Sequence, residues 1–148
     1  MLGISPQAIR GASAEHDPLL SAFIHHKYPR IACFSDALKL DPGRILSMAQ
    51  GCHTFLLSGG PPCQPFSCLS SQPGFSDDRT DPLLAFFQLR DFFEANCPRR
   101  GMQFVWFMEE VASMKEHARK RITALAGCAP GILPSADFGW LHRNRLVW

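Results

Sequence analysis

Residues 54–67 read TFLLSGGPPCQPFS. The first four, 54–57, form a short apolar run typical of a buried strand, and a polar loop follows it directly. In this loop Gly59 and Gly60 permit close backbone turns, and three prolines stiffen the chain around the thiol of Cys63. The pattern favours a positioned nucleophile, because orienting a reacting group lowers the barrier to its reaction. The alternative is an inert cysteine in a proline-rich turn.

Short apolar runs followed by helical patterns recur along the whole chain, and this alternation predicts an α/β fold. The run at 104–108 is almost wholly apolar, as in parallel strands that are covered on both faces. Strands are expected at 31–34, 54–57, 104–108, 131–138 and 145–148. Helices are expected from Pro18, from Pro82 to about Ala95 with Asp81 as the N-cap, and from 115 to 126.

Polar groups stand at the ends of the expected strands. Glu15 and Asp36 each follow a short strand, the Gly59–Cys63 segment follows the strand at 54–57, and Glu109 closes the strand at 104–108. In open parallel sheets, ligands bind beyond the carboxyl ends of the strands. A functional site is therefore expected at this edge of the sheet.

The composition fits a folded domain rather than a disordered segment, since 46% of the 148 residues are hydrophobic and 19% are charged. A net charge of +2 permits a nucleic-acid partner without requiring one. Arg99–Arg100 and the stretch 115–121 are local basic candidates for such a partner, with solvated helix faces as the alternative. The sequence shows no signal peptide and no apolar run of membrane length, so a soluble intracellular domain without a membrane partner is expected.

The six cysteines give no sign of a metal site. They contain no CxxC pair, and no grouping of Cys and His has the spacing of a zinc site. The adjacent His25 and His26 would point in different directions on a helix. We therefore expect no metal, and we expect most of the thiols to be buried and reduced.

The stretch Gly-Gly-Pro-Pro-Cys-Gln-Pro-Phe-Ser at 59–67 resembles the catalytic loop motif of DNA cytosine-5 methyltransferases. Residues 109–111, Glu-Glu-Val, stand where that family has Glu-Asn-Val at a strand end. Residues 143–145, Arg-Asn-Arg, resemble its Arg-x-Arg motif before a final apolar strand. The region from Glu109 to Met114 and the spacing on to Arg143 look most similar to the de novo subgroup.

The resemblance implies roles for four side chains in methyl transfer to carbon 5 of cytosine. Cys63 would add to carbon 6 of a cytosine flipped out of the DNA stack. Glu109 would hold ring nitrogen 3, a role for a protonated carboxyl that burial beside Glu110 would favour. Arg143 and Arg145 would brace the base carbonyl and the loop. The bland alternatives are a helix-capping Glu109 and two edge-strand arginines.

The resemblance also implies S-adenosylmethionine as the cofactor and DNA as the partner. Glu15 would hydrogen-bond the ribose, Asp36 would reach the adenine amino group, and Pro61 would lie at the cofactor. The remaining substrate-loop residues would be Gly59, Gly60, Pro62, Gln64 and Ser67. The implied fold is an incomplete Rossmann-like methyltransferase fold, with a mostly parallel sheet and helices on both faces.

Three departures from the family pattern shape the expectations for this chain. Glu110 replaces the family's Asn, and a carboxylate only accepts hydrogen bonds whereas an amide also donates them. The family's first motif, Phe-x-Gly-x-Gly, would precede residue 1, and its target-recognition region and return to the sheet would follow Trp148. Residues 1–148 are therefore expected to be a partial catalytic domain that lacks its first central strand and, in isolation, binds the cofactor weakly or not at all.

Two other functions stay open at this point. The chain could be a non-catalytic relative that regulates an active methyltransferase paralogue, as the substitution at Glu110 suggests. It could instead methylate cytosine in tRNA, because both nucleic acids present the same ring to Cys63. A DNA methyltransferase is expected in the nucleus of a eukaryote and otherwise in the cytoplasm.

Overall fold

The computed structural model describes residues 9–68, 71, 73–134 and 144–148. The strands are β1 (Gly11–Ala14), β2 (Ile31–Phe34), β3 (Thr54–Gly59), β4 (Gln103–Val111), β5 (Gly131–Leu133) and β6 (Arg145–Val147). The α-helices are α1 (Pro18–Lys27), α2 (Pro42–Met48), α3 (Asp81–Asn96) and α4 (Glu116–Ala126). The chain divides into two compact units, which we call unit 1 (Met1–Phe55 and Asp91–Phe104) and unit 2 (Leu56–Arg90 and Val105–Trp148).

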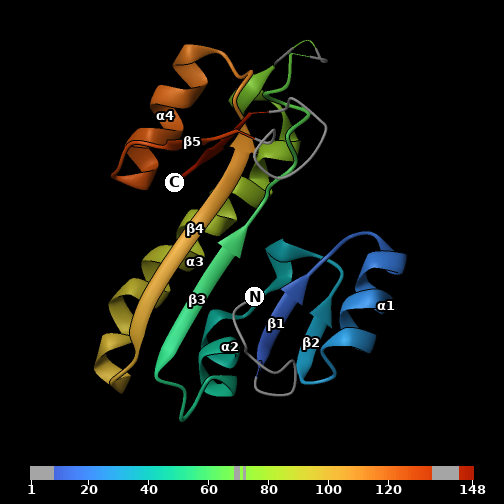
Figure 1. Ribbon diagram of the computed structural model, residues 1–148, viewed down its shortest axis with the longest axis vertical. Coiled ribbons are helices and arrows are strands. Elements are labelled where there is room, and N and C mark those ends of the chain that lie inside the picture. Colours follow the sequence, from blue (N-terminus) through green and yellow to red (C-terminus); the bar gives the residue numbers. More distant parts are fainter. Residues whose placement is uncertain (1–8, 69–70, 72, 135–143) are drawn as a thin grey trace. The chain divides into compact units, whose positions relative to one another are not determined.

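Unit 1 contains a parallel pair of strands, β1 and β2, with Gly11 opposite Ile31 and Ala14 opposite Phe34 (Figure 1). Helix α1 begins at Pro18, where the side chain of Asp17 accepts a hydrogen bond from the backbone N–H of Leu19 at 2.8 Å. Asp and Pro at these two positions are a common helix start, because they satisfy or remove free N–H groups.

A second part of unit 1 is held together by aromatic rings. Phe55 of β3 lies 4.4 Å from the ring of Phe93 in α3, and Phe104 of β4 lies within 6.3 Å of both rings. Such tilted contacts add to the burial of apolar surface. They fix the start of β3 and β4 against the end of α3.

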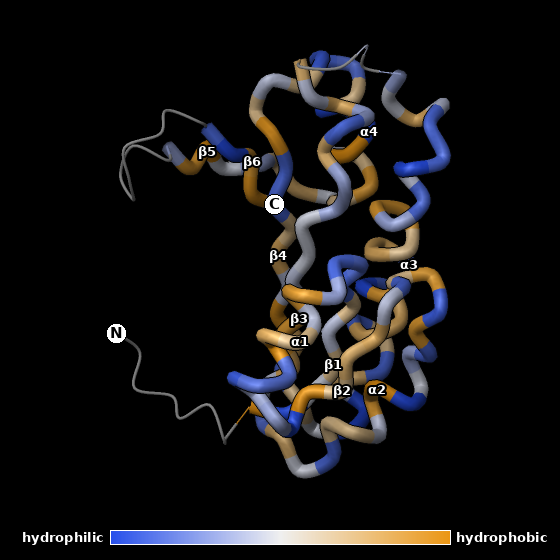
Figure 2. Tube along the Cα trace, turned by 90° about the vertical axis from the view of Figure 1, so that its right-hand side faces the viewer, coloured by the Kyte–Doolittle hydropathy of each residue, from blue (hydrophilic) through white to orange (hydrophobic). Residues whose placement is uncertain are grey.

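Unit 2 is built on the sheet with strand order β3-β4-β6-β5. The arrows of β3 and β4 point the same way in Figure 1, whereas β6 pairs with β4 and β5 pairs with β6 in antiparallel register. Helix α3 alternates hydrophobic and hydrophilic residues along its length (Figure 2), and Phe86 and Phe87 face Trp106 of β4. The core cluster comprises Phe66, Leu83, Phe86, Phe87, Met108, Val111, Met114, Ala118, Ile122, Ala126, Leu146 and Trp148.

The structure confirms the α/β fold and most of the expected elements. The strand at 31–34 has the predicted bounds, and the expected helices from Pro18 and at 115–126 are present as α1 and α4. The sequence missed α2, although Asp41 and Pro42 give it the same start signal as α1. The strand expected at 131–138 is seen as Gly131–Leu133, and residues 135–138 lie outside the described part of the chain.

Two predicted element ends were wrong. Asp81 has helical backbone angles and is the first residue of α3, because the 3-10 helix Asp78–Thr80 leads directly into it and Asp77 caps that turn. The strand predicted to close at Glu109 continues to Val111. It continues because β6 pairs with it, placing Glu109 opposite Val147 and Val111 opposite Arg145.

Candidate active site

The Cys63 loop, residues 60–67, leaves the end of β3 and turns sharply at the thiol. The carbonyl of Cys63 accepts hydrogen bonds from the backbone N–H groups of Phe66 at 2.9 Å and Ser67 at 2.8 Å. Pro65 and Phe66 are fully buried, whereas Cys63 is half-buried and packs against the core cluster of unit 2. The residues that follow the thiol are thus anchored in the core, which limits the positions that the thiol can take.

A second set of contacts holds the chain beyond the loop. The carbonyl of Pro65 accepts a hydrogen bond from the backbone N–H of Gly74 at 2.9 Å. The rings of Phe66 and Phe75 meet edge to face at 5.5 Å, and the guanidinium of Arg121 in α4 lies 4.1 Å from the centroid of Phe75. These contacts, which sequence reasoning missed, tie the Cys63 loop to α4.

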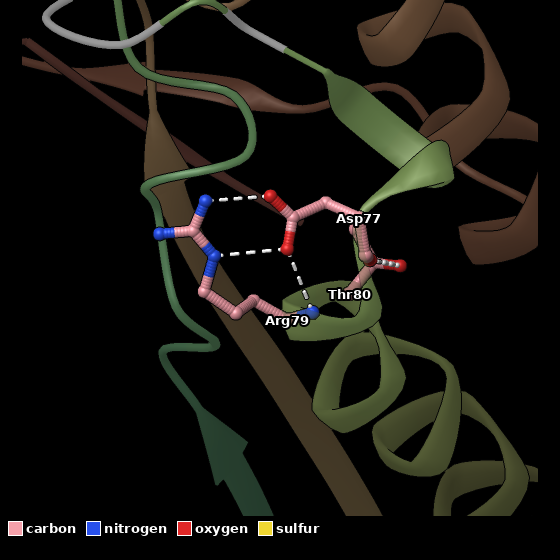
Figure 3. A network of polar contacts seen from close by, with 3 residues as sticks. All are labelled: Asp77, Arg79 and Thr80. Atoms are coloured by element: carbon pink, nitrogen blue, oxygen red, sulfur yellow. Dashed lines mark hydrogen bonds and ion pairs between the residues drawn. The ribbon is translucent and has the colours of Figure 1, made fainter.

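Asp77 and Arg79 form a further clasp next to this segment (Figure 3). The Asp77 carboxylate accepts hydrogen bonds from Arg79 Nε at 2.8 Å, Arg79 Nη2 at 2.6 Å and the Arg79 backbone N–H at 2.9 Å. The charge-assisted bonds from Arg79 lower the pKa of Asp77 to about 2. An Asp-x-Arg pair just before a helix is the sequence signal that would have located this clasp.

Gly59 at the end of β3 and Gly60 at the start of the Cys63 loop each leave space for a neighbouring side chain. Neither Gly59 nor Gly60 is among the glycines with positive φ. A Cβ at Gly59 would stand 2.6 Å from ring atom Cδ2 of Phe86 in α3. A Cβ at Gly60 would stand 3.4 Å from Glu109 Oε2. The glycines therefore let α3 and the Glu109 carboxylate approach the backbone beside the Cys63 loop.

Glu109 and Arg145 meet on the paired ends of β4 and β6. Arg145 Nε lies 2.7 Å from Glu109 Oε1, and the two side chains are 33% and 40% exposed. The pairing places the two residues diagonally across the strands, a distance that long side chains can bridge. The structure thus brings the Cys63 loop, Glu109 and Arg145 together in unit 2.

Glu110 points to the opposite face of β4 from Glu109 and is only 1% exposed. Its Oε2 accepts a hydrogen bond from the backbone N–H of Val111 at 2.7 Å, and its Oε1 has no partner within the described residues. Burial raises the pKa of Glu110 to about 7, and the neighbouring Glu109 charge adds to the rise. Sequence reasoning sought the buried acid at Glu109, but the structure buries Glu110 instead.

In unit 1, the two carboxylates predicted to bind a cofactor lie beyond the ends of neighbouring parallel strands. Glu15 follows β1 and donates its backbone N–H to the carbonyl of Phe34 at 2.9 Å, while its Oε1 accepts from the N–H of Asp17. Asp36 follows β2 and accepts from the N–H of Leu38 at 2.9 Å. That backbone bond, together with Lys39 at 3.4 Å, lowers the pKa of Asp36.

The remaining predicted site residues are Arg143 and four residues of the Cys63 loop. Arg143 lies outside the described residues. Pro61, Pro62 and Ser67 are half-buried, and Gln64 is exposed. All of these except Arg143 belong to the Cys63 loop.

The expectation that most thiols are buried was wrong, because only Cys97 is buried. Burial raises the pKa of the Cys97 thiol. All six cysteines are free thiols. Within the described residues, no cluster of three or more His, Cys, Asp or Glu side chains could hold a metal ion. The described helices include none that is long and apolar enough to cross a membrane.

Parallel strands followed by carboxylates in unit 1, and a cysteine loop near an acid and an arginine in unit 2, define an α/β protein with polar groups at the strand ends. The family described as C-5 cytosine-specific DNA methylase matches residues 14–125. The chain therefore belongs to this family.

A solved structure supports the fold independently of the family match. It is described as a candidate DNA modification methyltransferase encoded within a prophage of E. coli, and it superposes with a TM-score of 0.61 at 21% sequence identity. The similarity covers 93% of this chain and 38% of the E. coli protein, so the chain spans well under half the length of that structure. No curated protein matches the chain.

Proposed function

We propose that the chain carries part of the catalytic centre of a DNA cytosine-5 methyltransferase. The observation that supports this most directly is the meeting of three predicted residues in unit 2. Gly60 of the Cys63 loop lies against the Glu109 carboxylate, which is itself bonded to Arg145 at 2.7 Å. A nucleophile, an acid and a cation around one loop form a constellation suited to attack on a polar ring.

The first chemical step would be the addition of the Cys63 thiolate to carbon 6 of cytosine. A bond forms between Sγ and carbon 6, and the electron pair of the carbon 5–carbon 6 double bond moves into the ring, which makes carbon 5 nucleophilic. Glu109 would give a proton to ring nitrogen 3 so that negative charge does not build up on the base. Its contact with Arg145 holds the carboxyl group in a fixed orientation.

The second step restores the aromatic ring. Carbon 5 takes the methyl group, a base removes the carbon-5 proton, and the electrons of that C–H bond re-form the double bond as Cys63 leaves. Glu109 would recover the proton from nitrogen 3 at this stage. The family arginine at Arg143 would brace the base carbonyl.

S-adenosylmethionine would supply the methyl group as an electrophilic sulfonium. Glu15 and Asp36 suit its adenosine part, because they present carboxylates beyond the ends of the adjacent parallel strands β1 and β2. The ribose hydroxyls and the adenine amino group are donors that such carboxylates can accept. Pro61, in the Cys63 loop, would border the reactive end of the cofactor.

Covalent trapping tests the proposed reaction directly. The chain is mixed with S-adenosylmethionine and a DNA duplex that contains 5-fluorocytosine, whose fluorine cannot leave as a proton does. We expect a denaturant-stable complex that is absent with Cys63→Ser, and equally present with Cys128→Ser, which removes an exposed thiol. A folded chain that gives no complex contradicts the proposal.

One observation favours a second candidate function, that of a non-catalytic partner of an active methyltransferase. Glu110, where the family has Asn, places a buried carboxyl beside the site. Adding the chain to an active paralogue and measuring stimulation of that enzyme tests this role. Repeating the trapping with 5-fluorocytosine in a tRNA separates a DNA enzyme from a tRNA enzyme. For a DNA enzyme, we propose a nuclear location in a eukaryote and a cytoplasmic one otherwise.

A further inference from the structure

Two consecutive acids on β4 have opposite surroundings. Glu109 is 40% exposed and bonded to Arg145, whereas Glu110 is 1% exposed and has one carboxyl oxygen without a partner among the described residues. Alternate strand residues share a face, so Glu110 lies on the side of Met108, which is fully buried. Its neighbour across the sheet is Leu146, only 2% exposed. Glu110 is therefore set in the apolar core of unit 2.

The groups around Glu110 offer little to stabilise a negative charge. The charged groups that act on it are Glu109 on its own strand, which repels, and Arg145 on β6, which is already bonded to Glu109. Helix α4 contributes apolar side chains such as Ala118 and Ile122 to this core, and the Cys63 loop contributes Phe66 and the titratable thiol of Cys63. An unpaired charge in such a place is costly, so the neutral carboxylic acid is the favoured form.

The same core supports the proposed active site. Phe66 of the Cys63 loop and Val111 of β4 belong to one cluster, against which Cys63 packs. Glu109, the residue before Glu110, has its carboxylate beside Gly60. A charge that appears at Glu110 would attract water into this layer and disturb the loop and the strand end together.

We propose that Glu110 is a positioning residue that works as a neutral acid: while it holds its proton the Cys63 loop and Glu109 stay packed, and losing the proton as the pH rises loosens both. A protonated carboxyl has a donor as well as an acceptor, as the family's amide does, so the proton makes up for the replacement of Asn. The effect on reaction rate rests on the proposed function, whereas the effect on loop packing does not.

Hydrogen exchange tests the packing without relying on catalysis. The amides of Phe66, Ser67 and Val111, all hydrogen-bonded in the structure, are followed in the full chain at about pH 6 and about pH 8.5. After correction for intrinsic exchange, we expect roughly thirtyfold less protection at the higher pH, because it lies about 1.5 pH units above the Glu110 pKa of about 7 and each unit raises the ratio of ionised to neutral form tenfold. Glu110→Gln, a neutral isostere, should lose this pH dependence, and Glu116→Gln on the exposed face of α4 should keep it.

Equal protection at the two pH values in the unmodified chain overturns the inference, and this comparison needs no variant to fold. An infrared band of a protonated carboxyl at about pH 6, absent at about pH 8.5 and absent from Glu110→Gln, supports it; lack of that band in the unmodified chain overturns it.

The rate of trapping on the 5-fluorocytosine duplex provides the catalytic readout. Above about pH 7 we expect a progressive fall relative to Glu110→Gln, roughly tenfold per pH unit. Identical pH profiles for the two proteins overturn the positioning role. Absence of any complex in both, together with pH-dependent exchange in the unmodified chain alone, rejects the proposed function and supports the packing role of Glu110.

Discussion

Unit 2 places twelve residues in one buried apolar cluster, whereas neither β1, β2 nor α1 of unit 1 contains a single buried side chain. In α1, Leu19 is 79% exposed and Phe23 is 57% exposed. The residues that would react with the base all belong to unit 2, and those that would hold the adenosine part of the cofactor belong to unit 1. The two units therefore fix their functional side chains by different means.

In unit 2, packing positions the site. Phe86 occupies the space above Gly59, Phe66 anchors the Cys63 loop, and the pairing of β6 with β4 delivers Arg145 to Glu109. In unit 1, local hydrogen bonds to nearby backbone N–H groups hold Glu15 and Asp36 instead. Nucleophile and acid need fixed geometry, whereas groups that only bind can adjust on contact, so the difference suits the proposed division of labour.

The substitution Glu109→Gln should give the largest loss of activity, and it tests whether unit 2 carries the chemistry. The amide keeps the shape of the side chain but cannot supply a proton, so methyl transfer should fall by about 10² to 10³-fold. Single-turnover transfer of labelled methyl groups to a DNA duplex measures the loss. Glu116→Gln, which removes an exposed acid paired with Lys120 at 2.8 Å, is the matched control. Similar rates for the two variants would remove Glu109 from the reaction.

Glu110→Gln should change how the stability of the chain depends on pH. The folded-state pKa of about 7 lies above the ordinary value of 4.5, so the folded chain holds this proton more tightly than the unfolded chain. Stability contributed by the proton is complete below about pH 4.5 and is lost as the pH rises to about 7, a fall of about 3 kcal/mol. Urea unfolding at several pH values should show this fall in the unmodified chain, and it should be absent in Glu110→Gln. Parallel curves for the two proteins would place the titration elsewhere.

Gly59→Ala should destabilise the packed unit through crowding. The added Cβ would meet the Phe86 ring at 2.6 and 2.8 Å, and overpacking of this kind costs about 1–3 kcal/mol. The matched variant is Gly60→Ala, whose Cβ would meet Glu109 Oε2 at an ordinary 3.4 Å and should alter stability by less than about 0.5 kcal/mol. Urea midpoints compare the two, and equal midpoints would show that Phe86 moves aside freely.

Asp17→Ala should have the smallest effect on stability, and it tests how local hydrogen bonds hold α1 in unit 1. It removes the acceptor for the N–H of Leu19 at 2.8 Å and should cost about 1 kcal/mol. Helix α1 has no buried residue, whereas Ile45 and Leu46 anchor α2 in the core. Hydrogen exchange in the first turn of α1 should therefore increase more in Asp17→Ala than exchange in the first turn of α2 increases in Asp41→Ala. Equal increases in exchange would mean that the burial of α2 does not make it less dependent on its N-cap than α1 is.

The sequence predicted features that depend on neighbouring residues. The strand at 31–34 is a short apolar run between polar residues, and Asp17 with Pro18 marks a helix start, so both were identified correctly. The extent of β4 was not predictable, because its last residues are strand only through pairing with β6, which lies far along the chain. Neighbouring residues alone do not indicate such a pairing. The requirement for Gly59 depends on Phe86, and the burial of Glu110 depends on the whole core of unit 2. The roles of Cys63, Glu109 and Arg145 came from the family motifs, and the fold shows only that Gly60 of the Cys63 loop lies near Glu109 and that Glu109 contacts Arg145.

The antiparallel pairing of β6 with β4 also sets an order of events during synthesis. Cys63 and Glu109 emerge from the ribosome before Arg145, which a bacterial or eukaryotic ribosome adds on the order of seconds later. A nascent chain that stops short of residue 145 therefore exposes its acid without the cation that pairs with it in the finished protein. The pairing of β6 with β4 therefore joins Arg145 to Glu109 only after the Cys63 loop and β4 have already been made.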